Sequence, residues 1–84
     1  MIKIEFVIKS LKAVAYDNDL VIGVCKFLQN SKTWNIVHTH VDSKYQGQGI
    51  AKKLVNCVVL NAKNSGVNII ADCSYAKKIL KDIR

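Results

Sequence analysis

The feature that most constrains this chain is a switch in the spacing of its apolar residues, which falls at residues 46–51. Before the switch, apolar and β-branched residues gather in short runs, which are typical of strands. A single switch of this kind predicts a sheet followed by a helix that packs against it. After the switch, apolar residues recur at the spacing of one helix face, at Ala51, Leu54, Val55, Val58 and Ala62.

Polar turn residues divide the first half of the chain into four predicted strands. Asp17, Asn18 and Asp19 form one turn cluster, and residues 29–32 form a second polar turn. We expect no helix in this half, so the strands should follow one another as an antiparallel meander. The four strands are expected at residues 2–8, 13–16, 20–28 and 34–41.

The second half predicts a strand–helix–strand unit and a last helix. Gly66 lies where the helix that begins at Ala51 should stop. A strand is expected at residues 67–73, parallel to the preceding strand, because such crossovers join parallel strands. Ser74 is a suitable N-cap for the last helix, and the fold class is α+β in a single domain over residues 1–84. The apolar face of the last helix should be formed by Tyr75, Ala76, Ile79, Leu80 and Ile83.

Charge and length narrow the partners that such a chain can have. The chain has 84 residues and a net charge of +7, which favours anionic partners such as nucleic acid, an acidic protein or a phosphorylated cofactor. The aromatic residues do not alternate with basic ones as on a base-stacking surface, so nucleic acid is the less favoured partner. Three cysteines without a CxxC spacing predict neither a disulfide framework nor a zinc site.

The sequence also lacks signals for a membrane or for secretion. No apolar run approaches the roughly 20 residues that span a bilayer. The first residues lack the long apolar core of a secretory signal. We therefore expect a cytoplasmic protein that does not insert into a membrane.

The segment at residues 46–51, Gln-Gly-Gln-Gly-Ile-Ala, lies between a predicted strand and the start of a helix. A helix start has unpaired N–H groups and a partial positive charge, and glycines let the backbone approach a ligand closely. A phosphate or pyrophosphate therefore fits there, next to Lys52 and Lys53. A Walker A string is absent, and Lys52 stands where a dinucleotide fingerprint needs its third glycine. On these residues alone, an anion site and a tight turn both remain open.

Gln46, Gly49 and Ala51 match the pattern Gln/Arg-x-x-Gly-x-Gly/Ala, which resembles the pyrophosphate loop of the GCN5-related N-acetyltransferase (GNAT) superfamily. Two further motifs flank the loop, His38-Thr39 before it and Cys73-Ser74-Tyr75 after it. Together the motifs resemble a subfamily of very short acetyltransferase-like proteins, over a region from about residue 4 to residue 80.

The resemblance implies a minimal acyl-CoA N-acyltransferase (GNAT) fold, whose parallel strands splay apart around the pantetheine arm of acetyl-CoA. By the family pattern, backbone groups near Thr39 and Val41 hydrogen-bond the pantetheine. Ala71 replaces a proline that members often have. Many members also continue beyond the position of Arg84, so we expect a more open cofactor or substrate side. The implied acetyl-CoA-binding residues are Thr39, Val41, Gln46, Gly47, Gln48, Gly49, Ile50, Ala51, Lys52 and Lys53.

The resemblance also implies catalytic roles for Cys73, His38 and Tyr75. A cysteine at a helix start favours the thiolate, so Cys73 can take the acetyl group with His38 as base; alternatively it lines the site or only packs. A tyrosine near position 75 protonates the coenzyme A thiolate in many members, although Tyr75 can instead pack under the last helix. His38 and His40 share a strand face, but no third ligand is evident and we expect no metal.

The expected function is that of an acetyl-CoA-dependent N-acetyltransferase. Typical members have helices between their first strands that shape the acceptor pocket, and their absence here implies an open groove for an exposed amine of a protein or small molecule. The first alternative is a non-catalytic acyl-CoA-binding module, and the less favoured one is a basic nucleic-acid-binding domain. The expected partners are acetyl-CoA and an unidentified amine acceptor, and no oligomeric state is predicted.

Overall fold

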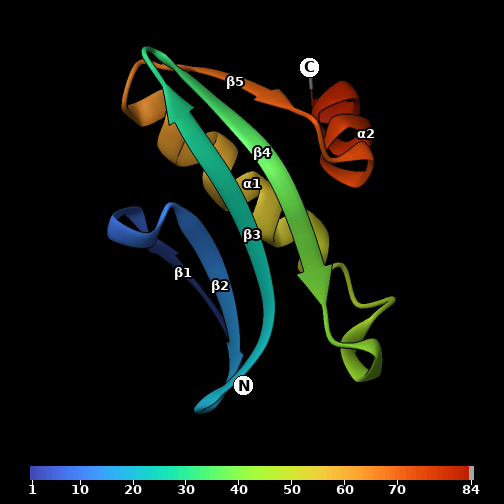
Figure 1. Ribbon diagram of the computed structural model, residues 1–84. Coiled ribbons are helices and arrows are strands. Elements are labelled where there is room, and N and C mark those ends of the chain that lie inside the picture. Colours follow the sequence, from blue (N-terminus) through green and yellow to red (C-terminus); the bar gives the residue numbers. More distant parts are fainter. Residues whose placement is uncertain (84) are drawn as a thin grey trace.

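The computed structural model describes the backbone of residues 1–83 and the side chains of residues 1–82. Arg84 and the side chain of Ile83 lie outside the described residues, and so does the expected place of Ile83 on the apolar face of the last helix. The described chain forms a five-stranded sheet, ordered β1-β2-β3-β4-β5, and two α-helices (Figure 1). The elements are β1 (Ile2–Val7), a 3-10 turn (Ile8–Ser10), β2 (Lys12–Asp17), β3 (Leu20–Asn30), β4 (Thr33–Val41), a second 3-10 turn (Ser43–Tyr45), α1 (Ile50–Asn64), β5 (Asn68–Ala71) and α2 (Ser74–Ile83).

The antiparallel meander predicted for the first half is confirmed. Strands β1 to β4 pair in sequence order, each antiparallel to the next, and β5 pairs with β4 in parallel. The turn between β3 and β4 is shorter than expected, because β3 extends to Asn30 and Ser31 adopts a left-handed φ of 54°. The α+β fold class and the parallel crossover are confirmed as well.

Strand β5 is shorter than the strand predicted at residues 67–73. Its pairing with β4 ends at the pair formed by Ile36 and Ala71. The next two backbone N–H groups, of Asp72 and Cys73, both donate to the carbonyl oxygen of Ile36, at 3.0 and 3.1 Å. Two donors on one acceptor do not continue a strand ladder, so the chain leaves the sheet at this point.

Beyond this point β4 runs on without β5, and a side-chain clamp marks the place where the two strands part. The Asn35 side chain donates to the Asp72 carboxylate at 2.8 Å and accepts from the Asp72 backbone N–H at 3.0 Å. From Val37 to Val41, β4 pairs with β3 alone among the described strands. Figure 1 shows this half of β4 continuing past β5 to the loop that precedes α1.

Helix α1 packs behind the sheet and presents the predicted apolar face to it (Figure 1). The side chains of Leu54, Val55, Val58 and Ala62 are fully buried, and Ala51 is half-buried. Burial of one such aliphatic side chain contributes about 1.5–3 kcal/mol. The stripe therefore anchors the helix whose first residues follow the glycine loop.

Helix α2 differs from its prediction at its first two residues. The carbonyl oxygen of Cys73 accepts the backbone N–H of Lys77 at 2.9 Å, which makes Cys73 the N-cap residue. The prediction of Ser74 as N-cap is therefore wrong by one residue. Tyr75 is 43% exposed, so its expected place on the buried face is also wrong, whereas Ala76, Ile79 and Leu80 are buried as predicted.

A β-bulge in β4 decides which side chains of that strand face α1. Lys26 of β3 pairs with His38, whereas the next residue of β3 pairs with Ile36, so Val37 is an extra residue on β4. Ile36 before the bulge and Thr39 after it consequently point to the same face of the sheet. His38 points to the opposite face, which α1 does not cover.

Candidate functional site

A cleft of about 550 Å³ opens beside the unpaired half of β4. It lies between that strand, the loop that precedes α1 and the first turn of α2. Gln48, Lys52 and Lys53 of the predicted cofactor residues are exposed and do not line the cleft, and neither do His38 and Cys73. The lining residues are Thr39, His40, Val41, Tyr45, Gln46, Gly47, Gly49, Ile50, Ala51 and Tyr75.

The start of α1 is built to leave backbone donors facing the cleft. Gly47 and Gly49 have φ angles of 82° and 77°, in the left-handed region that favours glycine, and no atom crowds either position. Gly49 is the N-cap residue and has no side chain to cap the helix. The first helical hydrogen bond runs from the N–H of Lys53 to the carbonyl oxygen of Gly49 at 3.1 Å. The N–H groups of Ile50 and Ala51 therefore have no partner within the helix. Such a start attracts an anion.

Gln46 ties the loop to the end of β4. Its side-chain amide donates to the carbonyl oxygen of Val41 at 3.2 Å. The Asp42 carboxylate then accepts the backbone N–H of Lys44 at 3.1 Å and so closes the short turn that follows. Gln46 therefore holds the loop in place. A ligand that hydrogen-bonds the Val41 carbonyl oxygen, as predicted, would share that oxygen with the Gln46 side chain.

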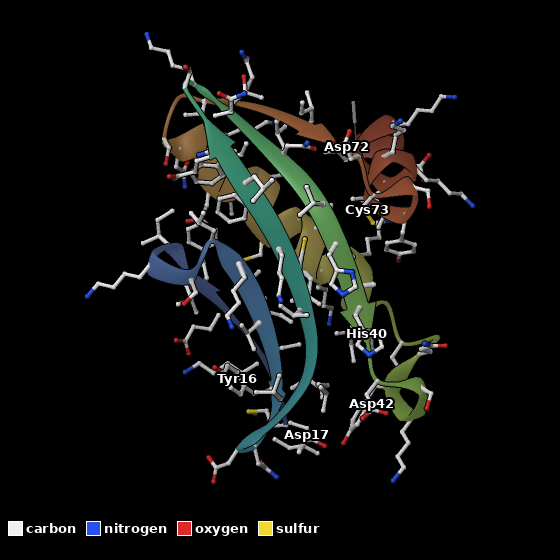
Figure 2. All side chains as sticks on the ribbon, viewed as in Figure 1. Tyr16, Asp17, His40, Asp42, Asp72 and Cys73 are labelled. Atoms are coloured by element: carbon white, nitrogen blue, oxygen red, sulfur yellow. The ribbon has the colours of Figure 1, made fainter. Side chains whose placement is uncertain are left out.

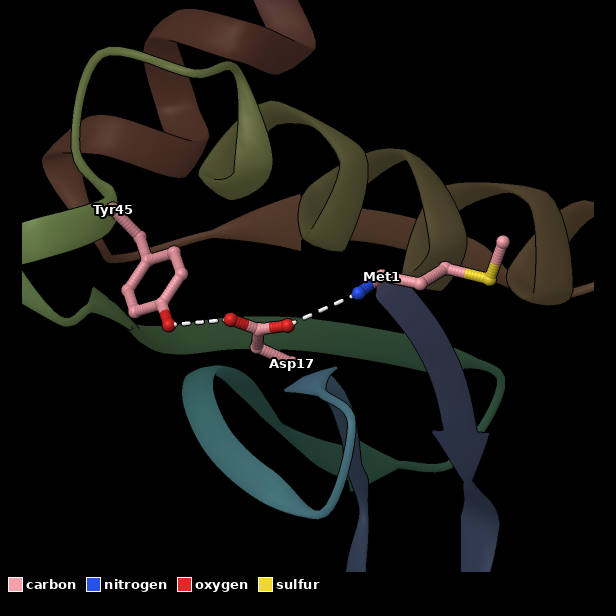
Figure 3. A network of polar contacts seen from close by, with 3 residues as sticks. All are labelled: Met1, Asp17 and Tyr45. Carbon is pink, nitrogen blue, oxygen red and sulfur yellow. Dashed lines mark hydrogen bonds and ion pairs between the residues drawn. The ribbon is translucent and has the colours of Figure 1, made fainter.

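Tyr45 is a cleft residue that the sequence analysis missed. Its hydroxyl donates to the Asp17 carboxylate at 2.6 Å, and the other carboxylate oxygen pairs with the amino group of Met1 at 3.2 Å (Figure 3). The hydrogen bond from Tyr45, followed by that from the Met1 amine, lowers the pKa of Asp17. The same bond raises the pKa of Tyr45, so the hydroxyl keeps its proton. An aromatic residue directly before a glycine loop was the signal available in the sequence.

The sulfur of Cys73 lies at the start of α2, at the junction with β5 (Figure 2). Partial burial opposes its ionisation, but hydrogen bonds outweigh burial and lower the pKa of the thiol. These hydrogen bonds join the sulfur to the backbone of Ala76, to the Thr39 hydroxyl, and to the backbone of Tyr75 and of Thr39. Cys73 thus caps α2 with its sulfur, a position that favours the thiolate.

Thr39 connects Cys73 to a second cysteine in the core. The Thr39 hydroxyl lies 3.7 Å from the sulfur of Cys73 and 3.6 Å from the sulfur of Cys25. Cys25 is fully buried, and burial raises its pKa to about 11. Sequence spacing offered no sign of this link between Thr39 and Cys25.

The structure does not bring His38 and Cys73 together. His38 stacks on His40, with ring centroids 6.3 Å apart and ring planes within 7° of parallel, so the two histidines share a face as predicted. Thr39, the intervening residue, turns to the other face and contacts Cys73. Across residues 1–83, no group of three or more histidine, cysteine or acidic side chains could hold a metal ion.

Comparison with known proteins links this arrangement to one family. The model of the family described as GCN5-related N-acetyl-transferase matches residues 12–83. A solved GCN5-like protein from Staphylococcus aureus is 30% identical with a TM-score of 0.74, over 96% of this chain and 79% of that chain. None of the curated proteins matches the sequence.

Two further solved structures resemble the chain. The IAA acetyltransferase from Bacillus cereus shares the fold, with 24% identity, a TM-score of 0.70, and coverage of 99% of this chain and 74% of that chain. A chain of the NatC complex bound to Gag peptide and CoA is 26% identical with a TM-score of 0.68, over 87% of this chain and only 55% of that chain. Neither described helix has the length and apolar character that crossing a bilayer requires.

Proposed function

Because this chain belongs to the GCN5-related N-acetyltransferase family, we propose that it transfers the acetyl group of acetyl-CoA to an exposed amine of a protein or small molecule. We further propose that residues 1–84 act as a single domain. The observation that carries the proposal is the cleft itself. It joins an uncapped helix start at one end to the unpaired edge of β4 and to Tyr75 at the other.

The glycine-loop end of the cleft suits the pyrophosphate of acetyl-CoA. The backbone N–H groups of Ile50 and Ala51 are unpaired within α1 and can each donate to a phosphate oxygen. Lys52 and Lys53 follow on the exposed side of the same helix and add positive charge near this end. The NatC complex, one chain of which shares this fold, is bound to Gag peptide and CoA, which supports the same ligand class here.

The unpaired edge of β4 suits the pantetheine arm. Backbone groups of residues 37–41 on this edge have no strand partner among the described residues. An extended ligand with amide groups can hydrogen-bond such an edge as an added strand does. Thr39 and Val41, the predicted contacts, both line the cleft on this edge.

The reaction needs an acceptor amine that loses a proton and a sulfur that leaves as thiolate. Acetyl-CoA supplies the activated thioester, and the acceptor nitrogen forms the new bond to the acetyl carbon as the bond to sulfur breaks. Tyr75 is a candidate to donate a proton to the departing sulfur, because it is exposed and lines the cleft. Cys73 contacts Thr39, which lines the cleft. Cys73 is therefore a candidate either to accept the acetyl group first or to remain passive during direct transfer.

A second candidate function is a non-catalytic acyl-CoA-binding module. The observation that favours it is the position of His38, the proposed base, on the opposite face of β4 from Thr39 and Cys73. If no other group removes the amine proton, the cleft binds acetyl-CoA without transferring its acetyl group. The two functions share the ligand and differ in turnover.

Ligand binding is tested by thermal unfolding with acetyl-CoA, coenzyme A, NAD and ATP in parallel. A ligand present at 100 times its dissociation constant should stabilise the protein by about 2.7 kcal/mol. We expect this stabilisation with acetyl-CoA and coenzyme A. Stabilisation by NAD or ATP alone would contradict the proposed ligand class.

Turnover is tested with a panel of amines, comprising a free peptide N-terminus, a lysine peptide and a polyamine, with products identified by mass. An enzyme that uses Cys73 as acetyl acceptor should lose turnover in Cys73→Ser while coenzyme A affinity stays unchanged. His38→Gln should lower turnover only if His38 acts as base from the opposite face of β4. Cys57→Ser is the matched control, because Cys57 lies within α1 and not at the start of α2. Tight binding of acetyl-CoA without acetylation of any amine would favour the second candidate function.

A further inference from the structure

A Thr39 hydroxyl between two cysteine sulfurs is the least expected arrangement near the cleft. Cys25 comes from β3, Thr39 from β4, and Cys73 from the N-cap of α2, so two strands and a helix start meet at one oxygen atom. The two oxygen–sulfur distances, 3.6 and 3.7 Å, are almost equal. Sulfur hydrogen bonds have such lengths, and the hydroxyl can therefore bond to either sulfur.

We propose that the Thr39 hydroxyl is a positioning group that turns from Cys25 to Cys73 when the Cys73 proton leaves, and so holds Cys73 in its reactive thiolate form. The catalytic meaning of this assignment rests on the proposed acetyl transfer, but its test does not. No assignment of Thr39 beyond a backbone contact with the cofactor follows from the sequence.

The Thr39 hydroxyl has a single proton, and this defines two hydrogen-bonded states of the arrangement. A threonine hydroxyl has one proton to donate and lone pairs to accept with. With a neutral Cys73, the thiol of Cys73 donates to the Thr39 oxygen, and the Thr39 hydroxyl donates to the sulfur of Cys25. When Cys73 loses its proton to solvent or to a free amine, the hydroxyl rotates and donates to the thiolate. The O–H bond of Thr39 remains intact throughout.

Burial of Cys25 allows the second state. Cys25 is 0% exposed and burial raises its pKa to about 11, so it keeps its proton near neutral pH. Its thiol can then donate to the Thr39 oxygen once the hydroxyl has turned to Cys73. Every group in the chain of hydrogen bonds thus has a partner in both states, which is the condition for a low-cost rearrangement at this partly buried place.

The test is the pH dependence of alkylation at Cys73, measured on the full chain with iodoacetamide and peptide mass spectrometry. Only the thiolate reacts, so the midpoint of the alkylation rate against pH reports the ionisation of that one thiol. For Thr39→Val we expect the midpoint to rise by about one pH unit, because one donor to the charged form is lost. At neutral pH the rate should fall about tenfold.

Matched variants separate the hydroxyl from the shape of the side chain. Thr39→Ser keeps a hydroxyl and should retain the wild-type midpoint to within about 0.3 units. Thr33→Val removes the hydroxyl of the other threonine of β4, in the half that pairs with β5, and should leave the midpoint unchanged. If Thr39→Val unfolds, Thr39→Ala removes the same hydroxyl without adding a methyl group.

An unchanged midpoint in a folded Thr39→Val or Thr39→Ala protein would overturn the proposal, and so would an equal rise in Thr33→Val. Acetylation assays on the same variants then distinguish the two proposals. If Thr39→Val raises the midpoint but the wild-type protein acetylates no amine, the role of Thr39 stands and the proposed enzymatic function fails. Cys57, on α1, serves as the internal reference in each digest.

Discussion

The two helices that border the cleft begin in different ways. At the start of α1, Gly49 supplies no side chain, and the backbone N–H groups of Ile50 and Ala51 have no partner within the helix. At the start of α2, the backbone of Tyr75 and of Ala76 hydrogen-bonds the sulfur of Cys73. Both starts have the same partial positive charge.

This difference shows how one backbone property supports two chemical tasks. Where the N-cap side chain is absent, the donors are available to a ligand that comes and goes. Where a thiol occupies the N-cap, the same donors act on the chain itself and favour the charged form of that thiol. The two helix starts therefore differ in whether their donors stay open or meet a side chain of the protein itself.

The largest effect should come from closing the start of α1. Gly49→Ala places an L side chain at a φ of 77°, which costs about 1–2 kcal/mol. If the bound loop needs this backbone, coenzyme A affinity measured by calorimetry should fall roughly 5- to 30-fold. Gly66→Ala is the matched control, because Gly66 has a φ of 70° at the other end of α1. An equal loss of affinity in Gly66→Ala would show that general destabilisation is the cause.

A smaller effect is expected from removing the cap of α2. Cys73→Ala deletes the group that accepts the backbone donors of the first turn, and loss of an N-cap costs about 1 kcal/mol. Cys73→Ser keeps a good capping atom and should be as stable as the wild type. Urea unfolding of both variants gives the comparison, and equal free energies of unfolding would contradict the capping role of the sulfur.

The smallest effect concerns the tether between the glycine loop and the β2–β3 turn. Tyr45→Phe removes the hydrogen bond to Asp17 and should weaken coenzyme A binding about two- to threefold, since the contact is near the surface. Tyr16→Phe, a change on β2 outside the cleft, should leave affinity unchanged. Equal binding by Tyr45→Phe and the wild type would show that the tether does not reach the ligand.

The same tether has a defined pH window. The pKa of Asp17 is lowered in the fold. The tether therefore contributes its full stability above the ordinary carboxyl pKa of about 4, and this stability is lost as the pH falls further. Because the pKa of Tyr45 is raised, the contribution is also complete below about 10 and is lost at higher pH. The difference in melting temperature between the wild type and Tyr45→Phe should therefore be largest at neutral pH and shrink toward both extremes.

Local chemistry made the helix face and the glycine loop predictable. The stripe from Leu54 to Ala62 and the glycines before it are neighbours in sequence, so spacing alone is sufficient to place them. The contact between Tyr45 and Asp17 joins residues 28 positions apart, and no local pattern encodes it. The N-cap of α2 was misplaced because serine is a preferred capping residue and cysteine is not, so residue type favoured Ser74 over Cys73.

The bulge at Val37 was the other feature that spacing could not predict. Val37 is β-branched like its neighbours, and nothing in its type marks it as an unpaired residue. Counting alternate residues from Ile36 would have turned His38 toward α1 and Thr39 away from it. Resemblance singled out His38 and Thr39 on this strand, but only the register shows which of them faces α1.

Val37 thus shifts the alternation of side chains along β4 by one residue. Its side chain is exposed and contributes little to the core, but the position that it adds determines the phase of every residue after it. Variants of this protein should therefore tolerate many different side chains at position 37 and almost no change of chain length there. A deletion would exchange the two faces of β4 in one step, which no single substitution can do.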